Sequence, residues 1–388
     1  MSEWRECELS EIAEVQTGPF GSQLKNEQYI TGGTPVVTVE HINNFRISDF
    51  KYPSVTNEDK ERLSRYLLNE DDIIFTRVGS VDLSAYVKAH QNGWIFSSRM
   101  LRVRPDKRVD SRFLSYFFQQ KSFREYILNI SVGATMPSIN TGILKSIPIS
   151  YPRLPEQKAI AAVLSSLDDK IDLLHRQNKT LEAMAETLFR QWFVVEAKED
   201  WEEETLADVS LNIRDSVKVD AIQESCNYIG LEHIDRRNIA LKECGLGGDV
   251  NSNKYAFSEK DILFGKLRPY FHKVCFAPFS GICSTDILVI RPIKKEWFCF
   301  CLFAFFQNDV VEFANLGSGG TRMPRTDWGT LKTYPIAIPD IETINRFNNF
   351  VLPSIDKIKI NLQQIKTLET LRDTLLPKLM SGEVRVTV

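Results

Sequence analysis

The chain has 388 residues, of which 43% are hydrophobic and 26% charged, and its formal net charge is −3 at neutral pH. This length exceeds what one hydrophobic core usually supports, so we expect two or three domains, and the composition excludes disorder as the main description. The slight negative charge excludes a protein that binds polyanions through bulk basicity. Any nucleic-acid surface must therefore be local.

Signals for membrane insertion, secretion or metal binding are missing from the sequence. No apolar run approaches the ~20 residues that cross a bilayer, and residues 1–10 have neither a basic start nor an apolar signal segment. The seven cysteines are scattered without a Cys-x-x-Cys pair, which predicts reduced thiols rather than a zinc site or disulfide bonds. We expect a cytoplasmic protein without membrane contact or bound metal.

Residues 1–152 are predicted to form a mixed α/β domain. Short apolar segments at 35–39, 72–75 and 100–103 have the composition of strands, and the segment 113–127 has the pattern of an amphipathic helix.

Residues 153–196 are predicted to form a long helix, because apolar residues recur there at spacings of three and four, as in a coiled-coil seam. Pro155, followed by Glu156, suits the start of a helix. A helix from about Pro155 to Phe193 would be about 57 Å long. Asn178 falls on the seam, where a buried amide commonly fixes the register. The predicted helix-pairing residues are Leu164, Leu167, Ile171, Leu174, Asn178, Leu181 and Leu188.

Residues 197–340 repeat the α/β pattern, with strands expected at 227–231, 261–264 and 287–290 and a helix at 297–313. Residues 341–388 contain a second long helix, which is expected to end near Leu375 because Pro377 follows. Its predicted pairing residues are Val351, Ile355, Ile358, Leu362, Ile365 and Leu368.

The two halves of the chain are copies of one another. A shift of 187 positions aligns Arg104-Pro105 with Arg291-Pro292, Met136-Pro137 with Met323-Pro324, and Asp169-Lys170-Ile171 with Asp356-Lys357-Ile358. Upstream the shift drifts, so each half has a variable front and a constant, helical back. Each long helix is the best-matched partner of the other, which predicts that the two helices pair with one another.

Signatures of catalysis are missing. The sequence contains no phosphate-binding P-loop, no nucleophile elbow and no His-Glu-x-x-His helix, and its glycine-rich stretches at 245–248 and 317–320 complete no dinucleotide fingerprint. Only His41 and His233 recur between the halves, each between Glu and Ile. They could form a polar group at a ligand or a structural pair at a strand end.

Basic residues recur at one predicted strand edge. Arg77 follows the strand that ends at Phe75, and Lys266 and Arg268 follow its counterpart. Guanidinium groups there could reach phosphates or a guanine edge, and the loops 131–138 and 317–325 offer backbone N–H groups. The alternative is that these loops only hold each front against its helix. The candidate DNA-contacting residues are Arg77, Lys88, Arg99, Thr135, Ser138, Lys266, Arg268, Thr321, Arg322 and Arg325.

The order of these motifs resembles the specificity subunit of type I restriction-modification enzymes. The similarity rests on the sequences at 145–149 (KSIPI), 155–160 (PEQKAI) and 167–171 (LDDKI), on their repetition, and on the ending at 375–386 (LLPKLMSGEVRV). It covers nearly the whole chain and is weakest in the fronts. One departure is the sequence Pro339-Asp340-Ile341-Glu342 in place of Pro-Glu-Gln-Lys, which leaves the start of the second helix open.

This resemblance implies an α+β protein with two target recognition domains, at 1–152 and 197–340, and long helices at 153–196 and 341–388. It also implies that the two helices form an antiparallel coiled coil and that the chain has a pseudo-two-fold internal repeat. It implies that each domain reads one half of an asymmetric bipartite site in double-stranded DNA. The helices would set the spacing and recruit two methyltransferase subunits that carry S-adenosylmethionine; restriction subunits are a further partner that the family allows. This chain would be non-catalytic and bind no cofactor. Two alternatives stay open: a coiled-coil interaction scaffold without DNA specificity, and a self-contained DNA-modifying enzyme.

Overall fold

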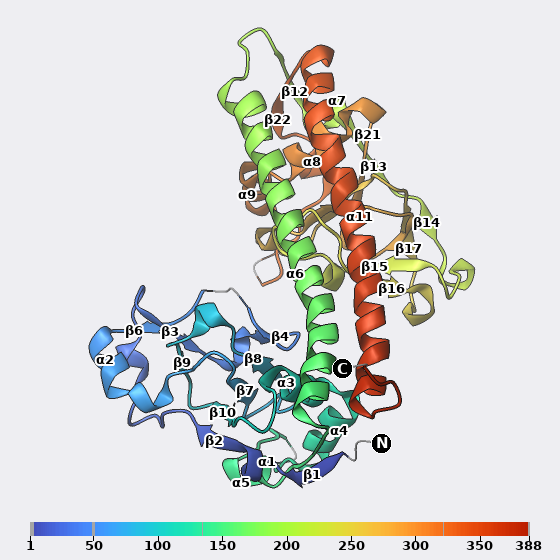
Figure 1. The fold of residues 1–388 in the computed structure, drawn as a ribbon. Helices are drawn as coiled ribbons and strands as arrows, with labels where there is room; N and C mark the ends of the chain where they lie inside the picture. Colours follow the sequence, from blue (N-terminus) through green and yellow to red (C-terminus); the bar gives the residue numbers. More distant parts are fainter. Residues whose placement is uncertain (1–3, 49–50, 134, 321, 387–388) are drawn as a thin grey trace. The chain divides into compact units, whose positions relative to one another are not determined.

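The computed structural model describes residues 4–48, 51–133, 135–320 and 322–386. The chain divides into two compact units, labelled here unit 1 (Met1–Asp169 with Leu368–Val388) and unit 2 (Lys170–Thr367). Each unit holds one α/β front and one segment of each long helix, so each is described by itself (Figure 1).

The front of unit 1 is built on an antiparallel sheet with the strand order β2-β10-β7-β8. Side chains alternate across this sheet. Ile73 and Phe75 of β7 pack into one apolar cluster with the helices, whereas Ile74 packs into a second cluster on the other face. The sheet is therefore buried on both faces. The elements are β1 (Arg5–Glu8), α1 (Leu9–Ile12), β2 (Ala13–Thr17), β3 (Thr34–Val37), β4 (Ile42–Asn43), β5 (Arg46–Ile47), β6 (Ser54–Val55), α2 (Asn57–Arg62), β7 (Ile73–Thr76), β8 (Ser84–Tyr86), β9 (Ile95–Phe96), β10 (Met100–Pro105), α3 (Ser111–Gln119), α4 (Lys121–Ile130), α5 (Thr141–Lys145) and β11 (Pro148–Tyr151).

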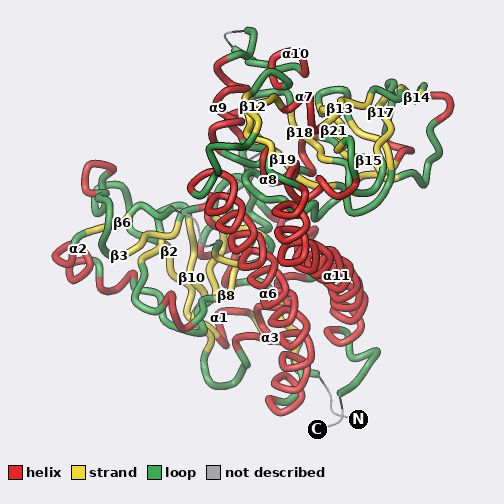
Figure 2. The backbone as a smooth tube through the Cα atoms, turned by 90° about the horizontal axis from the view of Figure 1, so that it is seen from above, coloured by secondary structure: helices red, strands yellow, loops and turns green. Residues whose placement is uncertain are grey.

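The front of unit 2 repeats this topology, with the sheet order β13-β21-β18-β19 (Figure 2 shows the strands of both fronts). A separate strand pair closes each front: β1 pairs with β11 in unit 1, and β12 pairs with β22 in unit 2. The elements are β12 (Glu202–Thr205), α7 (Leu206–Val209), β13 (Ser210–Ile213), β14 (Ser216–Val217), β15 (Asn227–Ile229), β16 (Gly245–Leu246), β17 (Lys254–Phe257), β18 (Ile262–Gly265), β19 (Val274–Phe276), β20 (Gly281–Cys283), β21 (Ile287–Pro292), α8 (Phe298–Phe305), α9 (Asn308–Leu316), α10 (Trp328–Leu331) and β22 (Pro335–Ile338).

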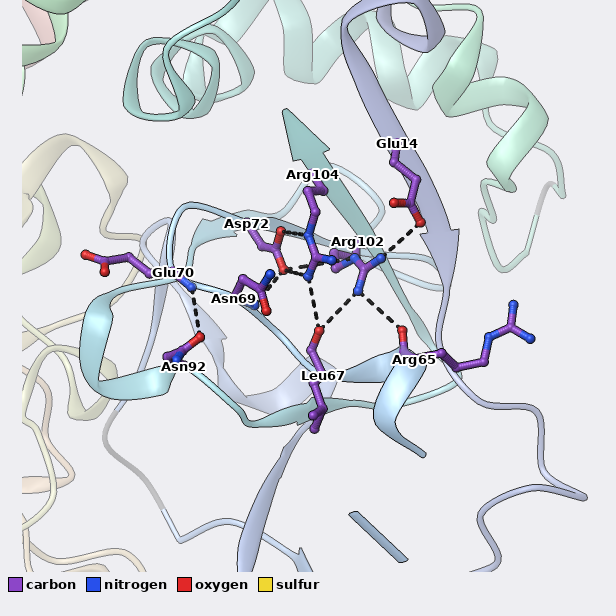
Figure 3. A network of polar contacts seen from close by, with 9 residues as sticks. All are labelled: Glu14, Arg65, Leu67, Asn69, Glu70, Asp72, Asn92, Arg102 and Arg104. Carbon is purple, nitrogen blue, oxygen red and sulfur yellow. Dashed lines mark hydrogen bonds and ion pairs between the residues drawn. The ribbon is translucent and has the colours of Figure 1, made fainter. Parts of the chain in front are cut away.

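The duplicated Arg-Pro motif forms a buried ion pair in each front. Arg104 donates from Nε and Nη2 to the two carboxylate oxygens of Asp72, at 2.7 Å each, inside the polar network of Figure 3. Arg291 makes the same two-pronged contact with Asp261, again at 2.7 Å. Both carboxylates are almost fully buried. The motif therefore serves the fold: a buried carboxylate needs such a partner, and two parallel bonds fix how the strands join.

The two long helices are α6 (Leu154–Arg190), which continues as one π-helical turn at Gln191–Val195, and α11 (Ile341–Met380). In unit 1, Arg372 of α11 donates to Asp168 of α6 at 2.9 Å. In unit 2, Asn361 of α11 donates to Asn178 of α6 at 2.7 Å. Partner numbers rise on one helix as they fall on the other. The predicted antiparallel pairing is thus confirmed.

The predicted pairing residues are all buried or half-buried. Leu164, Ile171, Leu174, Asn178, Val351, Ile355, Ile358 and Ile365 are buried, and Leu167, Leu181, Leu188, Leu362 and Leu368 are half-buried. The structure adds Asn361, which is fully buried and bonds to Asn178. The sequence pattern alone did not identify it.

Three predicted helix limits are wrong. The segment 113–127 is two helices, α3 and α4, because Gln120 between them has an extended ψ of 140°. The segment 297–313 is likewise split into α8 and α9, before the extended Gln307. Pro377 does not end the last helix, which runs on to Met380. A proline so near the end removes one backbone bond, and the burial of Leu376 and Leu379 offsets that loss.

No single helix among the described residues is long and apolar enough to cross a membrane. The segments Lys295–Phe305 and Asn308–Leu316, bent by 67° at their junction, pass the test of length and composition only as a pair.

Candidate nucleic-acid interface

Three polar side chains gather at one end of the central sheet in unit 1, a group named edge 1 (Thr17, Arg77 and Arg99). Arg77 directly follows β7, and Arg99 directly precedes β10, its antiparallel neighbour, so the two meet. The Arg77 amide donates to the Arg99 carbonyl at 2.8 Å, and Arg77 Nη1 donates to Thr17 Oγ1 at 3.2 Å. Edge 1 thus sets the backbones of two arginines side by side, with the Arg77 guanidinium bound to Thr17.

A loop closes over edge 1, named loop 1 (residues 131–138). Val132 and Ser138 exchange two backbone bonds of 2.9 and 2.8 Å, and the Gly79 amide donates to the Pro137 carbonyl at 2.9 Å. Gly133 has φ +106°, and a Cβ there would lie 2.7 Å from the Met136 carbonyl oxygen, so this position requires glycine. The side chains at the tip stay in solvent: Met136 is 63% exposed.

Unit 2 has the same arrangement with different side chains, named edge 2 (Arg214, Lys266, Asp286 and Arg325). The Lys266 amide donates to the Asp286 carbonyl at 2.8 Å, as Arg77 does to Arg99. Arg325 Nη2 lies 2.9 Å from Asp286 Oδ1. Burial lowers the pKa of Lys266, as do the nearby Arg325 and Arg214, whereas Asp286 raises it. Edge 2 therefore combines donors with one acidic acceptor.

The equivalent loop in unit 2, loop 2 (residues 317–325), is held in the same way. Gly319 and Arg325 exchange backbone bonds of 3.2 and 3.0 Å, and the Arg268 amide donates to the Pro324 carbonyl at 2.7 Å. The repeated Met-Pro sequence thus forms the tip of the same loop in both units.

A second basic group in unit 2 surrounds a strained turn at residues 268–272. Arg268 and His272 both adopt left-handed backbone angles, with φ 51°. The Phe271 ring lies under the guanidinium groups of Arg236 (3.8 Å to the ring centroid) and Arg268 (5.9 Å). Tyr270 beside it is 51% exposed. Guanidinium groups interleaved with aromatic rings are typical of surfaces that bind nucleic acids.

The candidate residues from the sequence divide into three sets. Arg77, Arg99, Thr135 and Ser138 lie at edge 1 or on loop 1, and Lys266, Arg268, Arg322 and Arg325 lie at edge 2, its adjoining turn or loop 2. The structure does not bring Lys88 to edge 1. That residue follows β8, whose Tyr86 pairs with Ile73, and so it lies at the opposite end of the sheet. Thr321 lies outside the described residues.

Sequence reasoning missed Arg214, Arg236, Tyr270 and Asp286. The signal for Asp286 was present, because the repeat aligns it with Arg99. Arg214 carried no such signal. It joins edge 2 only through the strand register that sets β13 beside β21.

The repeated histidines have a structural role in the described chain. The Thr38 amide donates to His41 Nδ1 at 3.0 Å, and the Gly230 amide donates to His233 Nδ1 at 2.9 Å. This favours the structural interpretation of the pair. All seven cysteines are free thiols. Within the described residues, no group of three or more His, Cys, Asp or Glu side chains could hold a metal ion.

Comparison with known proteins agrees with this architecture. Residues 1–183 and 198–370 each match the family model described as "Type I restriction modification DNA specificity domain". The chain is 26% identical to the MjaIX specificity subunit of Methanocaldococcus jannaschii (99% of this chain and 94% of that protein). It is 21% identical to the HindI specificity subunit of Haemophilus influenzae (99% and 100%).

A crystal structure of the S subunit of a type I system from M. genitalium has the same fold, with a TM-score of 0.62 over 97% of this chain and 96% of that one, at 16% identity. The family model covers both halves and the fold repeats in both units. The chain therefore belongs to the family of type I restriction-modification DNA specificity subunits.

Proposed function

We propose that this chain is the non-catalytic DNA specificity subunit of a type I restriction-modification complex, acting in the cytoplasm. In this proposal front 1 (residues 1–152) and front 2 (residues 197–340) are target recognition domains, and each reads one half of a bipartite site in double-stranded DNA. The observation that carries the proposal is the pair of matching edges: the same loop and strand ends recur in both units, but with different charged side chains.

The difference between the edges supports an asymmetric site. Edge 1 offers guanidinium groups, which bond well to the O6 and N7 acceptors of guanine. Edge 2 adds the Asp286 carboxylate, which accepts from the exocyclic amino group of cytosine or adenine. Two identical readers would select a palindrome, whereas these two select unlike half-sites.

Repeated surface features of the two long helices favour a partner protein that binds in two copies. Exposed apolar side chains recur at equivalent positions of the repeat: Leu173 and Ile360 are each 50% exposed, and Met184 and Leu371 are 56% and 44% exposed. On each helix these two residues lie eleven positions apart, hence on nearly the same face. We assign these faces to two methyltransferase subunits, which would carry S-adenosylmethionine. Restriction subunits would be further partners of the same complex.

The test is a genome-wide map of methylated bases in cells with and without this chain. The expected result is a gapped, non-palindromic methylated sequence that appears only with the chain. Methylation that is independent of the chain, or a palindromic motif, would contradict the proposal.

Paired variants assign the half-sites. Arg77→Ala with Arg99→Ala should relax one half of the motif, and Lys266→Ala with Arg325→Ala the other, because each lost base contact removes about 1–3 kcal/mol of discrimination. Lys88→Ala is the matched control, since Lys88 lies at the opposite end of the sheet. Relaxation of both halves by either pair would refute the assignment of one edge to one half.

A further inference from the structure

Asp168 of α6 ties front 1 to both long helices within unit 1. Its Oδ2 accepts from the Tyr116 hydroxyl of α3 at 2.6 Å. Its Oδ1 accepts from Arg372 Nη1 of α11 at 2.9 Å and from Arg46 Nη2 of β5 at 3.4 Å. One carboxylate therefore meets a front helix, a front strand and the opposite long helix. Burial and the neighbouring Asp168 raise the pKa of Tyr116, so its hydroxyl stays protonated and donates.

A second polar contact lies in the first turn of α6, near the N-terminal end of that helix. Gln157 is fully buried; its Oε1 accepts from the Asp110 amide at 2.7 Å, and its Nε2 donates to the Pro152 carbonyl at 2.9 Å. Asp110 is itself the N-cap of α3. Front 1 thus meets the helices through directional hydrogen bonds at two levels, a set named joint 1 (Arg46, Tyr116, Gln157, Asp168 and Arg372).

The repeat replaces joint 1 in unit 2 with apolar side chains. The 187-residue shift aligns Tyr116 with Phe303, Gln157 with Ile344, Asp168 with Ile355 and Arg372 with Ala185. All four replacements are buried in one hydrophobic cluster of unit 2, a set named joint 2. Unit 2 makes charged contacts at other positions, among them Arg237 with Glu186 at 2.7 Å and Lys359 with Glu259.

We propose that Asp168 is a positioning residue, which fixes the orientation of front 1 on the paired helices through charged hydrogen bonds, whereas front 2 is held by apolar packing at the equivalent positions. Hydrogen bonds to a charge weaken steeply when their geometry changes, but apolar burial has no direction. Under the proposed function, on which this last step rests, loss of Asp168 lets front 1 shift and relaxes the spacing between half-sites while leaving both sequences readable.

The first test needs no DNA. Hydrogen exchange of the full chain should show amides of Arg46–Ile47 and of α3 exchanging about tenfold faster in Asp168→Asn, since opening of the joint becomes easier. Asp169→Asn is the matched control, because that neighbouring carboxylate is exposed. Equal exchange in Asp168→Asn and the wild type overturns the proposal.

Replacing residues of joint 1 with their counterparts from joint 2 distinguishes stabilisation by charge from stabilisation by packing. The triple variant Tyr116→Phe, Asp168→Ile, Arg372→Ala gives unit 1 three of the four residues of joint 2. In the wild type, exchange at the joint should speed up as salt rises from about 0.05 M to about 1 M, because salt screens partly exposed ion pairs. In the triple variant this dependence should vanish. If it persists, charge does not hold the joint.

The functional readout is the methylation map of cells that carry Asp168→Asn. We expect methylated sites with a spacer one base pair longer or shorter, and unchanged half-site sequences. An unchanged spacer together with faster exchange would refute the positioning role in DNA reading. If the wild type produces no chain-dependent methylated motif, the proposed function is contradicted instead. The hydrogen-exchange test of joint 1 does not depend on that outcome.

Discussion

At the residue scale, Glu182 is the carboxylate in the described part of unit 2 whose pKa is shifted most by its surroundings. It lies on α6, its carboxylate accepts a hydrogen bond from the Ile239 amide at 3.0 Å, and its side chain is half-buried. Burial raises its pKa from 4.5 to about 7; Glu186 raises it too, while the Ile239 amide, Arg237 and Lys242 act in the other direction. The protonated form is thus the one that suits the fold.

This shift predicts how stability depends on pH. Because the pKa of Glu182 is higher in the folded state, its contribution to stability is complete below about 4.5 and is lost as the pH rises through about 7. Glu182→Gln keeps an acceptor for the Ile239 amide without the charge. It should raise the free energy of unfolding at pH 8 by about 2 kcal/mol and flatten its decline between pH 5 and 7.

Urea unfolding at several pH values measures this effect. Glu243→Gln, at an exposed carboxylate of the same front, serves as the control and should change little. If the free energy of unfolding of Glu182→Gln depends on pH as strongly as that of the wild type, ionisation of Glu182 does not destabilise the folded state.

At the element scale, the segment of the helix pair in unit 2 contains a buried polar layer, Asn178 with Asn361. The bond between them leaves Asn178 Nδ2 and Asn361 Oδ1 buried without a partner. The repeat places Leu174 and Ile365 at the corresponding positions, and both are buried. The polar layer therefore lowers stability relative to an apolar one, and it distinguishes this register from others.

A double-mutant cycle tests that account. Asn178→Leu or Asn361→Leu alone should cost about 1–3 kcal/mol, because the remaining amide stays buried with too few partners. The double variant should be close to neutral or more stable than the wild type. Thermal unfolding gives the coupling energy. Two costs that simply add would mean that the amides act independently.

The same helices show what the sequence could and could not predict. The spacing of apolar residues was sufficient to predict α6, α11 and their pairing, whereas the antiparallel direction came from the resemblance to the family. Asn361 was not predicted as a pairing residue, because its partner depends on how the two helices are offset along their axes. The spacing of apolar residues within one helix does not give that offset. The extended Gln120 between α3 and α4 escaped because no proline or glycine marks that break.

The candidate interface was predictable to a similar extent. Arg77 and Lys266 were found because each follows a strand whose composition was clear. Arg214 was not found, and Lys88 was included, because both positions depend on strand register. Register arises from contacts between distant segments, and the local pattern of a short strand leaves it open.

At the scale of the whole molecule, the net charge of −3 means that any cationic surface for DNA must be local. Leu173 lines a surface groove of about 500 Å³, and Met184 lines another of about 610 Å³. Apolar residues so placed are typical of surfaces that another protein covers.

The proposed binding of two methyltransferase subunits rests on the repeat of these exposed apolar residues, and it can be tested. Leu173→Glu should reduce the number of bound methyltransferase subunits from two to one, and Leu173→Glu with Ile360→Glu should abolish binding. Each buried charge costs several kcal/mol at such an interface. Native mass spectrometry of the purified complex measures the copies. Gln363→Glu, at an exposed polar position of α11, should retain both, and a double variant with two copies would rule out these faces.

The strand pairs that close the fronts have an evolutionary consequence. Arg5 lies opposite Tyr151, and Glu202 lies opposite Ile338, so the chain enters and leaves each front at one place. A front is thus a unit whose replacement at this strand pair would leave both long helices uninterrupted. A different domain at the position of front 1 would still need a hydroxyl and a guanidinium that bind Asp168, as Tyr116 and Arg46 do. This requirement limits the domains that the position accepts.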